Sequence, residues 1–180
     1  MKVKTTNTDV LILEPEVFGD ERGYFFESYN HKTFSKSACI KTDFVQDNHS
    51  HSVYHVLRGL HYQLKKPQGK LVRVVTGEVY DVAVDLRESS ATFGKWTGVH
   101  LSAAVHQEVW VPPGFAHGFL VLSETADFLY KTTDYYDAKD EFCLMWDDPF
   151  VGVEWPLKTR PLLSPKDAEG KSFTNLPYFP

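Results

Sequence analysis

Several features that define other protein classes are scarce in this chain of 180 residues. It has only two cysteines, Cys39 and Cys143, and their spacing fits neither a disulfide framework nor a metal or redox motif. We therefore expect a reducing, cytoplasmic location. No hydrophobic run approaches the length of a membrane span, and the N-terminal stretch has only four consecutive apolar residues, too few for a signal peptide.

Positive charge is also in deficit. The 19 Lys and Arg residues stand against 24 Asp and Glu residues, which gives a formal net charge of -5. Proteins that bind nucleic acids usually carry the opposite balance, so no nucleic-acid partner is expected. The chain has no internal repeat, low-complexity run or linker, and its length suits one domain over residues 1–180.

Short segments rich in Val, Phe, Tyr and Trp, separated by Gly, Pro, Asp and Asn, make up most of the chain. We predict strands over 10–14, 23–29, 70–77, 78–87, 96–103, 108–114, 118–123 and 126–133. Short helices are expected over 31–38 and 164–170, the second with Ser164 as N-cap and Pro165 at the first helical position. Many short strands at close spacing predict a sandwich or a barrel.

The segment after Gly77 alternates most clearly. Tyr80, Val82, Val84 and Leu86 fall on one face and mainly polar residues on the other, which predicts a strand with one buried face. The tail from residue 155 onward is rich in proline and is expected to wrap the barrel as extended chain.

The stretch RGLHYQ concentrates polar groups on a predicted strand. His61 and Gln63 share a face, whereas Arg58 points away unless Gly59 hosts a bulge. A lone histidine here would most often be an ordinary surface residue. Lys70 follows on the next strand, which favours a functional cluster.

The stretch PPGFAHGF resembles the Pro-x-Gly-x-x-His turn of the cupins, with its histidine at His117. In metal-binding cupins this histidine completes a set begun by His-x-His and a downstream Glu. Here Gln63 replaces the second histidine and no suitable Glu follows, so only His61 and His117 remain. Three ligands are the usual minimum for a catalytic divalent metal, and we therefore expect no metal.

Three further motifs admit two interpretations each. The tyrosines of FLYKTTDYYD, among them Tyr130, fit either aromatic packing or proton donation. Gln46 and Asn48 in FVQDNHS share a strand face and suit sugar hydroxyls or a pyrimidine edge, but they also fit a polar turn. Arg22 beside Gly23 can hold a phosphate, or it can belong to an acidic hairpin turn.

Together, these segments resemble one family, the dTDP-4-dehydrorhamnose 3,5-epimerases. The matching stretches run in family order from Val17 to Asp167 and include VFGDERGYFFESYN, VLRGLHYQ, QGKLVRVVTGEVYDVAVDLR and WVPPGFAHGFLVLSE. The resemblance implies an all-β fold, a double-stranded β-helix (cupin or jelly-roll) barrel with a few short helices. It also implies conversion of dTDP-4-dehydro-6-deoxy-D-glucose to dTDP-4-dehydro-L-rhamnose, without metal or cofactor, in dTDP-L-rhamnose biosynthesis.

The resemblance also implies residue roles. His61 matches the base, Asp167 its dyad partner, Tyr130 the proton donor and Lys70 the residue beside the substrate oxyanion. Substrate-lining positions are matched by Arg22, Glu27, Gln46, Asn48, Arg58, His117, Glu141 and Lys166, and the residue that stacks on thymine by Tyr136. One departure is the stretch HSVYHVLRG, which replaces a commoner short polar turn.

Other functions remain open. Single-position epimerases and a 3,4-ketoisomerase share the scaffold, and Tyr130 favours the double epimerase over the ketoisomerase. A metal-dependent cupin oxygenase or isomerase and a non-catalytic sugar-nucleotide-binding module are the alternatives from other classes. The family also implies a homodimer with N-terminal strand exchange, for which VLILEPEVF is a plausible segment.

Overall fold

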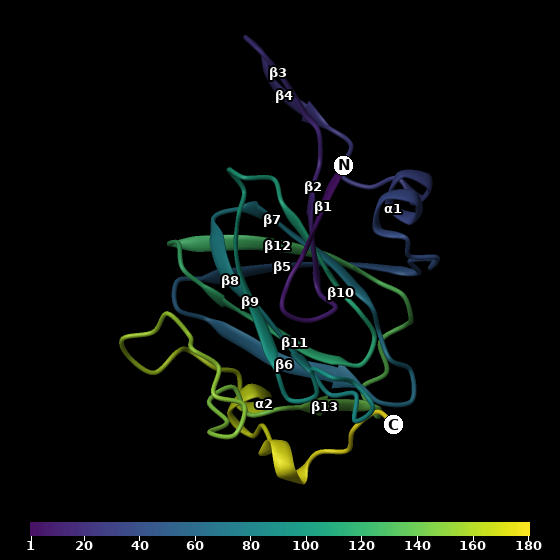
Figure 1. The fold of residues 1–180 in the computed structure, drawn as a ribbon. Coiled ribbons are helices and arrows are strands. Elements are labelled where there is room, and N and C mark those ends of the chain that lie inside the picture. Colours follow the sequence, from purple (N-terminus) through teal and green to yellow (C-terminus); the bar gives the residue numbers. More distant parts are fainter.

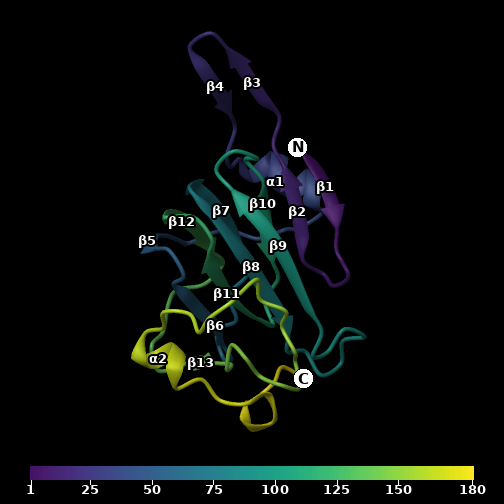
Figure 2. The same ribbon diagram turned by 90° about the vertical axis from the view of Figure 1, so that its left-hand side faces the viewer.

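The computed structural model describes residues 1–180 and consists mainly of two facing β-sheets (Figures 1 and 2). The six-stranded sheet has the order β1-β2-β10-β7-β12-β5, and the five-stranded sheet has the order β13-β6-β11-β8-β9. Their strands are β1 (Lys2–Thr5), β2 (Leu11–Glu14), β5 (Gln46–Val53), β6 (Leu57–Gln63), β7 (Lys70–Thr76), β8 (Glu78–Asp85), β9 (Trp96–Ser102), β10 (Glu108–Val111), β11 (Phe115–Val121), β12 (Thr125–Thr132) and β13 (Glu141–Cys143).

The main core lies between the sheets. Val72 of β7 and Phe128 of β12 meet Val79 of β8 and Phe119 of β11 in a cluster of 14 buried hydrophobic residues. The rings of Phe119 and Phe128 stack across the barrel with centroids 4.2 Å apart. The expected all-β, cupin-like barrel is confirmed, and each predicted strand overlaps an observed one.

Both predicted helices are present. Helix α1 (His31–Ala38) places Phe34 against Leu13, Leu71 and Trp110 and so covers part of the outer face of the six-stranded sheet. Helix α2 (Pro165–Ala168) begins with Pro165, and a 3-10 turn follows at Phe173–Asn175. None of these helices has the length and hydropathy that crossing a bilayer requires.

The prediction that β8 buries one face is wrong, because both faces are buried. Val82 and Val84 point outward, where chain after β13, including Phe173, packs over them as the Pro-rich tail was expected to do. The polar face, with Asp81, points into the barrel. The two faces of β8 therefore differ in composition and not in exposure: the outward face is apolar, and the inward face combines Asp81 with Val79 and Ala83.

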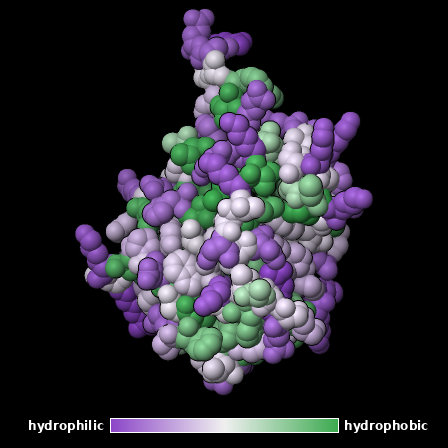
Figure 3. Space-filling model, viewed as in Figure 1, coloured by the Kyte–Doolittle hydropathy of each residue, from purple (hydrophilic) through white to green (hydrophobic).

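A two-stranded hairpin, β3 (Val17–Asp20) with β4 (Gly23–Phe26), projects away from the barrel (Figures 1 and 2). Strand β2, which belongs to the stretch VLILEPEVF, pairs with β10 of its own chain. Phe18, Tyr24 and Phe25 are all more than half exposed on this hairpin. Figure 3 shows hydrophobic surface where the hairpin joins the body.

Candidate active site

A cavity of about 300 Å³ opens between the two sheets. Most of its lining side chains are polar or charged, which is unusual for the inside of a barrel. Those named by the sequence are Arg58, His61, Lys70, His117, Tyr130, Lys166 and Asp167. The four residues given catalytic roles therefore meet in one place.

Glycine positions the base. The register between β6 and β11 shifts between the pairs His117↔His61 and Phe119↔Arg58, so β6 has a bulge at Gly59, the position where the sequence allowed one. Gly59 adopts φ +108° there, and a Cβ would lie 2.6 Å from the carbonyl oxygen of His117. The bulge brings Arg58 to the cavity, where its Nε donates to Ser52 Oγ at 3.0 Å.

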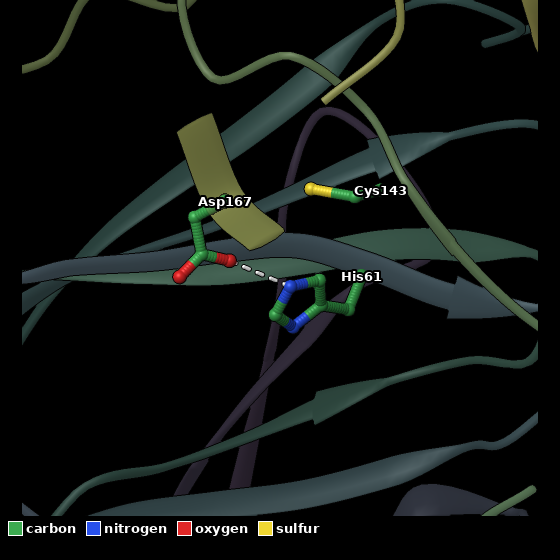
Figure 4. A group of neighbouring side chains, drawn as sticks. All are labelled: His61, Cys143 and Asp167. Carbon is green, nitrogen blue, oxygen red and sulfur yellow. Dashed lines mark ion pairs between the residues drawn. The ribbon is translucent and has the colours of Figure 1, made fainter. Parts of the chain in front are cut away.

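Helix α2 supplies the partner of the base. Nε2 of His61 lies 2.7 Å from Oδ1 of Asp167 (Figure 4). Asp167 accepts hydrogen bonds from the Gly59 amide at 3.1 Å and from Ser164 Oγ at 2.6 Å. Burial acts to raise the pKa of Asp167, but the contacts with His61 and Ser164 outweigh it and hold the pKa below its usual value. The carboxylate is therefore ionised and fixed beside the imidazole.

A buried ammonium lies beside the same histidine. Lys70 belongs to β7 of the opposite sheet and is 7% exposed. Its Nζ donates to the main-chain oxygen of His61 at 3.4 Å. Burial lowers the pKa of Lys70 to about 8, and the nearby negative charges of Glu141 and Asp81 oppose that shift. A mostly protonated, poorly solvated cation results, which can stabilise an oxyanion strongly.

Tyr130 approaches from the other side. It belongs to β12 of the six-stranded sheet, whereas His61 belongs to β6 of the five-stranded sheet, and both line the cavity. Burial, and then the charge of Glu141, raise the pKa of Tyr130. The phenol therefore keeps its proton until an acceptor enters the cavity.

Sequence reasoning missed Asp81. Its Oδ2 lies 2.9 Å from Nε2 of His117, and both residues are buried, so a second histidine–carboxylate pair borders the cavity, which His117 lines. The only feature of the sequence that could have indicated this pair is the position of Asp81 on the polar face of the strand that became β8. His117 is paired with Ala83, two residues further along, and this diagonal neighbourhood of β8 and β11 is not visible in the sequence.

Three predicted binding residues form a network next to the base. Tyr136 donates to Glu141 Oε2 at 2.7 Å, and Lys166 forms an ion pair with the same oxygen. Burial favours a higher pKa for Glu141, but the bonds from Lys166 and Tyr136 lower it. Oε1 of Glu141 lies 3.8 Å from Nδ1 of His61, so the network reaches the base.

The remaining predicted residues lie further out. Gln46 and Asn48 do share a face of β5, and Gln46 Nε2 donates to Asn48 Oδ1 at 2.9 Å. The structure does not bring Arg22 and Glu27 to the cavity of their own chain. Arg22 pairs with Asp20 at the hairpin tip, and Glu27 accepts a bond from Asn30 at 2.9 Å.

The fold and the cavity define a class of protein. A cupin-like barrel that presents an imidazole and a phenol from opposite sheets, with an ammonium in the same cavity, can remove a proton beside a carbonyl and return one to the opposite face. This is the chemistry of an epimerase.

Comparisons with known proteins identify the family. The family model described as dTDP-4-dehydrorhamnose 3,5-epimerase matches residues 4–175. A dTDP-4-dehydrorhamnose 3,5-epimerase of Pseudomonas aeruginosa is 56% identical over 96% of this chain and 95% of its own length. The crystal structure of dTDP-6-deoxy-D-glucose-3,5-epimerase from Legionella pneumophila, in complex with dTDP-4-keto-L-rhamnose, has a TM-score of 0.95 at 49% identity and covers 98% of this chain and 94% of its own. The chain belongs to the dTDP-4-dehydrorhamnose 3,5-epimerase family.

Membership confirms the resemblance found in the sequence and the enzyme class. The protein is an isomerase of nucleotide-linked sugars. A second relative, from Shigella flexneri, is 56% identical over 98% of this chain and of its own length, so the match is not confined to the motifs.

Proposed function

We propose that the protein converts dTDP-4-dehydro-6-deoxy-D-glucose to dTDP-4-dehydro-L-rhamnose by moving protons at C3 and C5 without metal or cofactor. The convergence of His61, Lys70, Tyr130 and Asp167 on one cavity carries this proposal. The carbons C3 and C5 flank the C4 ketone, so loss of a proton from either gives an enolate. Inversion requires return of a proton to the opposite face, for which two groups on opposite sides are needed.

His61 acts as the base in this scheme. Because Nε2 is against Asp167, Nδ1 is the nitrogen left to accept the proton. Asp167 holds the ring in that tautomer and stabilises the imidazolium, as the carboxylate of a catalytic triad does. Positioned acids and bases of this kind contribute about 10²–10⁴-fold to the rate.

Lys70 stabilises the negative charge that develops on O4, for which one fixed donor contributes roughly 3–4 kcal/mol. Tyr130 returns the proton from the opposite sheet. His117, held by Asp81, and Arg58 line the sugar pocket, with Lys166 and Glu141 at its edge. Tyr136, which is half exposed, stacks on the thymine, and Gln46 and Asn48 extend the nucleotide side.

We further propose that the enzyme is a homodimer in which the β3–β4 hairpin delivers Arg22 and Glu27 to the partner's cavity. The hairpin projects from its own barrel and exposes three large aromatic residues, which is typical of an interface. Residues 1–180 would form one domain of each subunit, since both sheets share one core. The cytoplasmic location stays a prediction.

Exchange in heavy water tests the reaction. With dTDP-4-dehydro-6-deoxy-D-glucose as substrate, NMR should show deuterium at both C3 and C5, and a downstream reductase should trap the L-lyxo product. His61→Ala should abolish exchange at both carbons, whereas Tyr130→Phe should impair inversion more than exchange. Exchange at only one carbon would identify a single-position epimerase. No exchange, together with intact dTDP binding, would indicate a sugar-nucleotide-binding module.

A further inference from the structure

Cys143 has no part in the reaction described above, yet it lies beside the base. Strand β13 pairs with β6, and in their register Cys143 is directly opposite His61. A ring nitrogen of His61, Sγ of Cys143 and a carboxylate oxygen of Asp167 all lie within 4.8 Å of one another. Figure 4 shows the sulfur and the carboxylate on the Nε2 side of the ring.

These three side chains come from three different elements, β6, β13 and α2. Asp167 is 4% exposed, and His61 and Cys143 are partly buried. The present bonds of the sulfur are weak, since Sγ contacts only the Leu144 carbonyl oxygen at 3.7 Å. A thiol with no strong partner therefore faces an imidazole nitrogen and an ionised carboxylate.

We propose that His61, Cys143 and Asp167 form a binding site for a thiophilic divalent cation such as Zn²⁺, and that occupation of this site inhibits the epimerase reversibly. Thiolate, imidazole and carboxylate are the ligands that Zn²⁺ prefers in proteins. Three protein ligands leave the fourth tetrahedral position for water. The thiolate and the carboxylate together neutralise the charge of the ion.

The distances favour this ligand set. Zinc bonds of about 2.0–2.3 Å in a tetrahedral site place the ligand atoms roughly 3.5 Å from one another. The observed separations, 2.7 Å between His61 and Asp167 and no more than 4.8 Å within the cluster, lie on both sides of that value. Side-chain adjustments of about 1 Å are therefore sufficient, and the backbone pairing of β6 with β13 can stay unchanged.

The bound metal would inhibit the enzyme because it changes which nitrogen of His61 carries the ring proton. On binding, Cys143 loses its thiol proton to solvent and a metal–sulfur bond forms. Nε2 of His61 bonds to the metal through its lone pair, so the ring proton moves to Nδ1, where Glu141 can accept it as a hydrogen bond. Nδ1 is then no longer free to take a proton from the sugar. The proposal of a metal site rests on the placement of these three side chains, whereas the inhibition rests on the role proposed above for His61.

Cadmium provides a test that does not require turnover, because cadmium–thiolate bonds have a charge-transfer band in the ultraviolet. The reduced enzyme would be titrated with Cd²⁺ alone, and the Zn²⁺ dependence of kcat measured in parallel. Cys143→Ser removes the proposed sulfur ligand, and Cys39→Ser is the matched control because Cys39 is the other thiol and is exposed.

Wild type and Cys39→Ser should show the cadmium band and lose kcat as Zn²⁺ is added, with full recovery after chelation. Loss of a group that merely orients a metal ligand costs about 10–100-fold in affinity, so loss of the thiolate itself should cost at least as much. Cys143→Ser should therefore lack the band and need at least about tenfold more Zn²⁺ for the same inhibition, with its metal-free kcat unchanged.

Two results would overturn the proposal: a cadmium band that survives in Cys143→Ser, or equal Zn²⁺ sensitivity of that variant and wild type. Failure of the proposed function would be recognised separately. In that case the band would depend on Cys143 although no epimerisation occurred in the metal-free enzyme.

Discussion

The two ring nitrogens of His61 have different neighbours. Nε2 lies 2.7 Å from a carboxylate oxygen of Asp167, whereas Nδ1 lies 3.8 Å from one of Glu141. The Glu141 carboxylate also pairs with Lys166 and accepts a hydrogen bond from Tyr136. This asymmetry assigns the proton-accepting role to Nδ1. The two carboxylates beside His61 therefore have different roles: Asp167 orients the ring, and Glu141 forms part of the binding network.

Asp167→Asn tests the orienting role. The amide cannot stabilise an imidazolium as a carboxylate does, so kcat should fall by about 10²–10⁴-fold while dTDP affinity changes little. Steady-state kinetics and a dTDP titration would measure both quantities. Ser164→Ala, which removes one bond to Asp167 but leaves its charge, is the control and should have a much smaller effect on kcat.

The pKa of Lys70 predicts a decrease in kcat/KM at alkaline pH, the alkaline limb of the pH profile. Its pKa, lowered by burial to about 8, means that the cation is lost as pH rises through 8, and kcat/KM should fall there. Tyr130 titrates above its usual value of 10, so it does not account for this limb. Lys70→Met should lower kcat about 10²–10³-fold, and residual activity in Lys70→Arg should lack the limb. A limb unchanged in Lys70→Arg would contradict the assignment.

At the scale of elements, the bulge in β6 determines where the base points. Gly59→Ala places a Cβ against the His117 carbonyl at a φ that side chains rarely adopt, so unfolding free energy should fall by about 2–3 kcal/mol. Activity should fall with it, because His61 lies two residues away. Gly152→Ala is the control, because Gly152 also has a positive φ, +62°, but a Cβ added there would have no atom within 4 Å. This substitution should lower the unfolding free energy by only about 1–2 kcal/mol. Thermal unfolding would compare the two.

Strand β10 carries a buried acid, Glu108, which lines a second cavity of about 320 Å³; Tyr130 lines this cavity as well as the one around His61. Burial raises the pKa of Glu108 to about 8, although Arg73 and Lys131 oppose the shift. The folded state therefore binds more protons than the unfolded chain between pH 4.5 and 8, and stability falls as pH rises through this range.

Glu108→Gln should remove that slope. At pH 8.5 the variant should be more stable than wild type by about 1–3 kcal/mol, because it avoids an ionised group with a buried, unpartnered Oε2. For a chain of this size, that raises Tm by roughly 2–4 °C per kcal/mol. Melting curves from pH 4 to 9 would show it, and parallel pH profiles for variant and wild type would refute it.

At the scale of the whole molecule, the proposed exchange of hairpins can be tested by complementation. His61→Ala and Arg22→Ala subunits should each be inactive or weak as homodimers. If Arg22 acts in the partner's cavity, co-expressed heterodimers contain one site with both residues and should regain activity. No gain on mixing would mean that Arg22 acts within its own chain or not at all.

Local rules predicted much of this molecule and failed where distant segments meet. Alternation and capping located β8 and helix α2, and the glycine in RGLHYQ marked the position where a bulge could form. The burial of both faces of β8 depends on the C-terminal tail, and the pairing of Asp81 with His117 depends on strand register. The convergence of His61, Tyr130 and Asp167 was foreseen through family resemblance only, because three separate elements supply them.

More than half of the 180 residues lie between His61 and Asp167, and helix α2, which carries the carboxylate, follows every strand of the two main sheets. All of these strands are therefore synthesised before the histidine acquires its partner. A product that ends before α2 retains every main-sheet strand yet lacks the group that orients the base. Chains shortened in this way should therefore lose at least as much activity as Asp167→Asn.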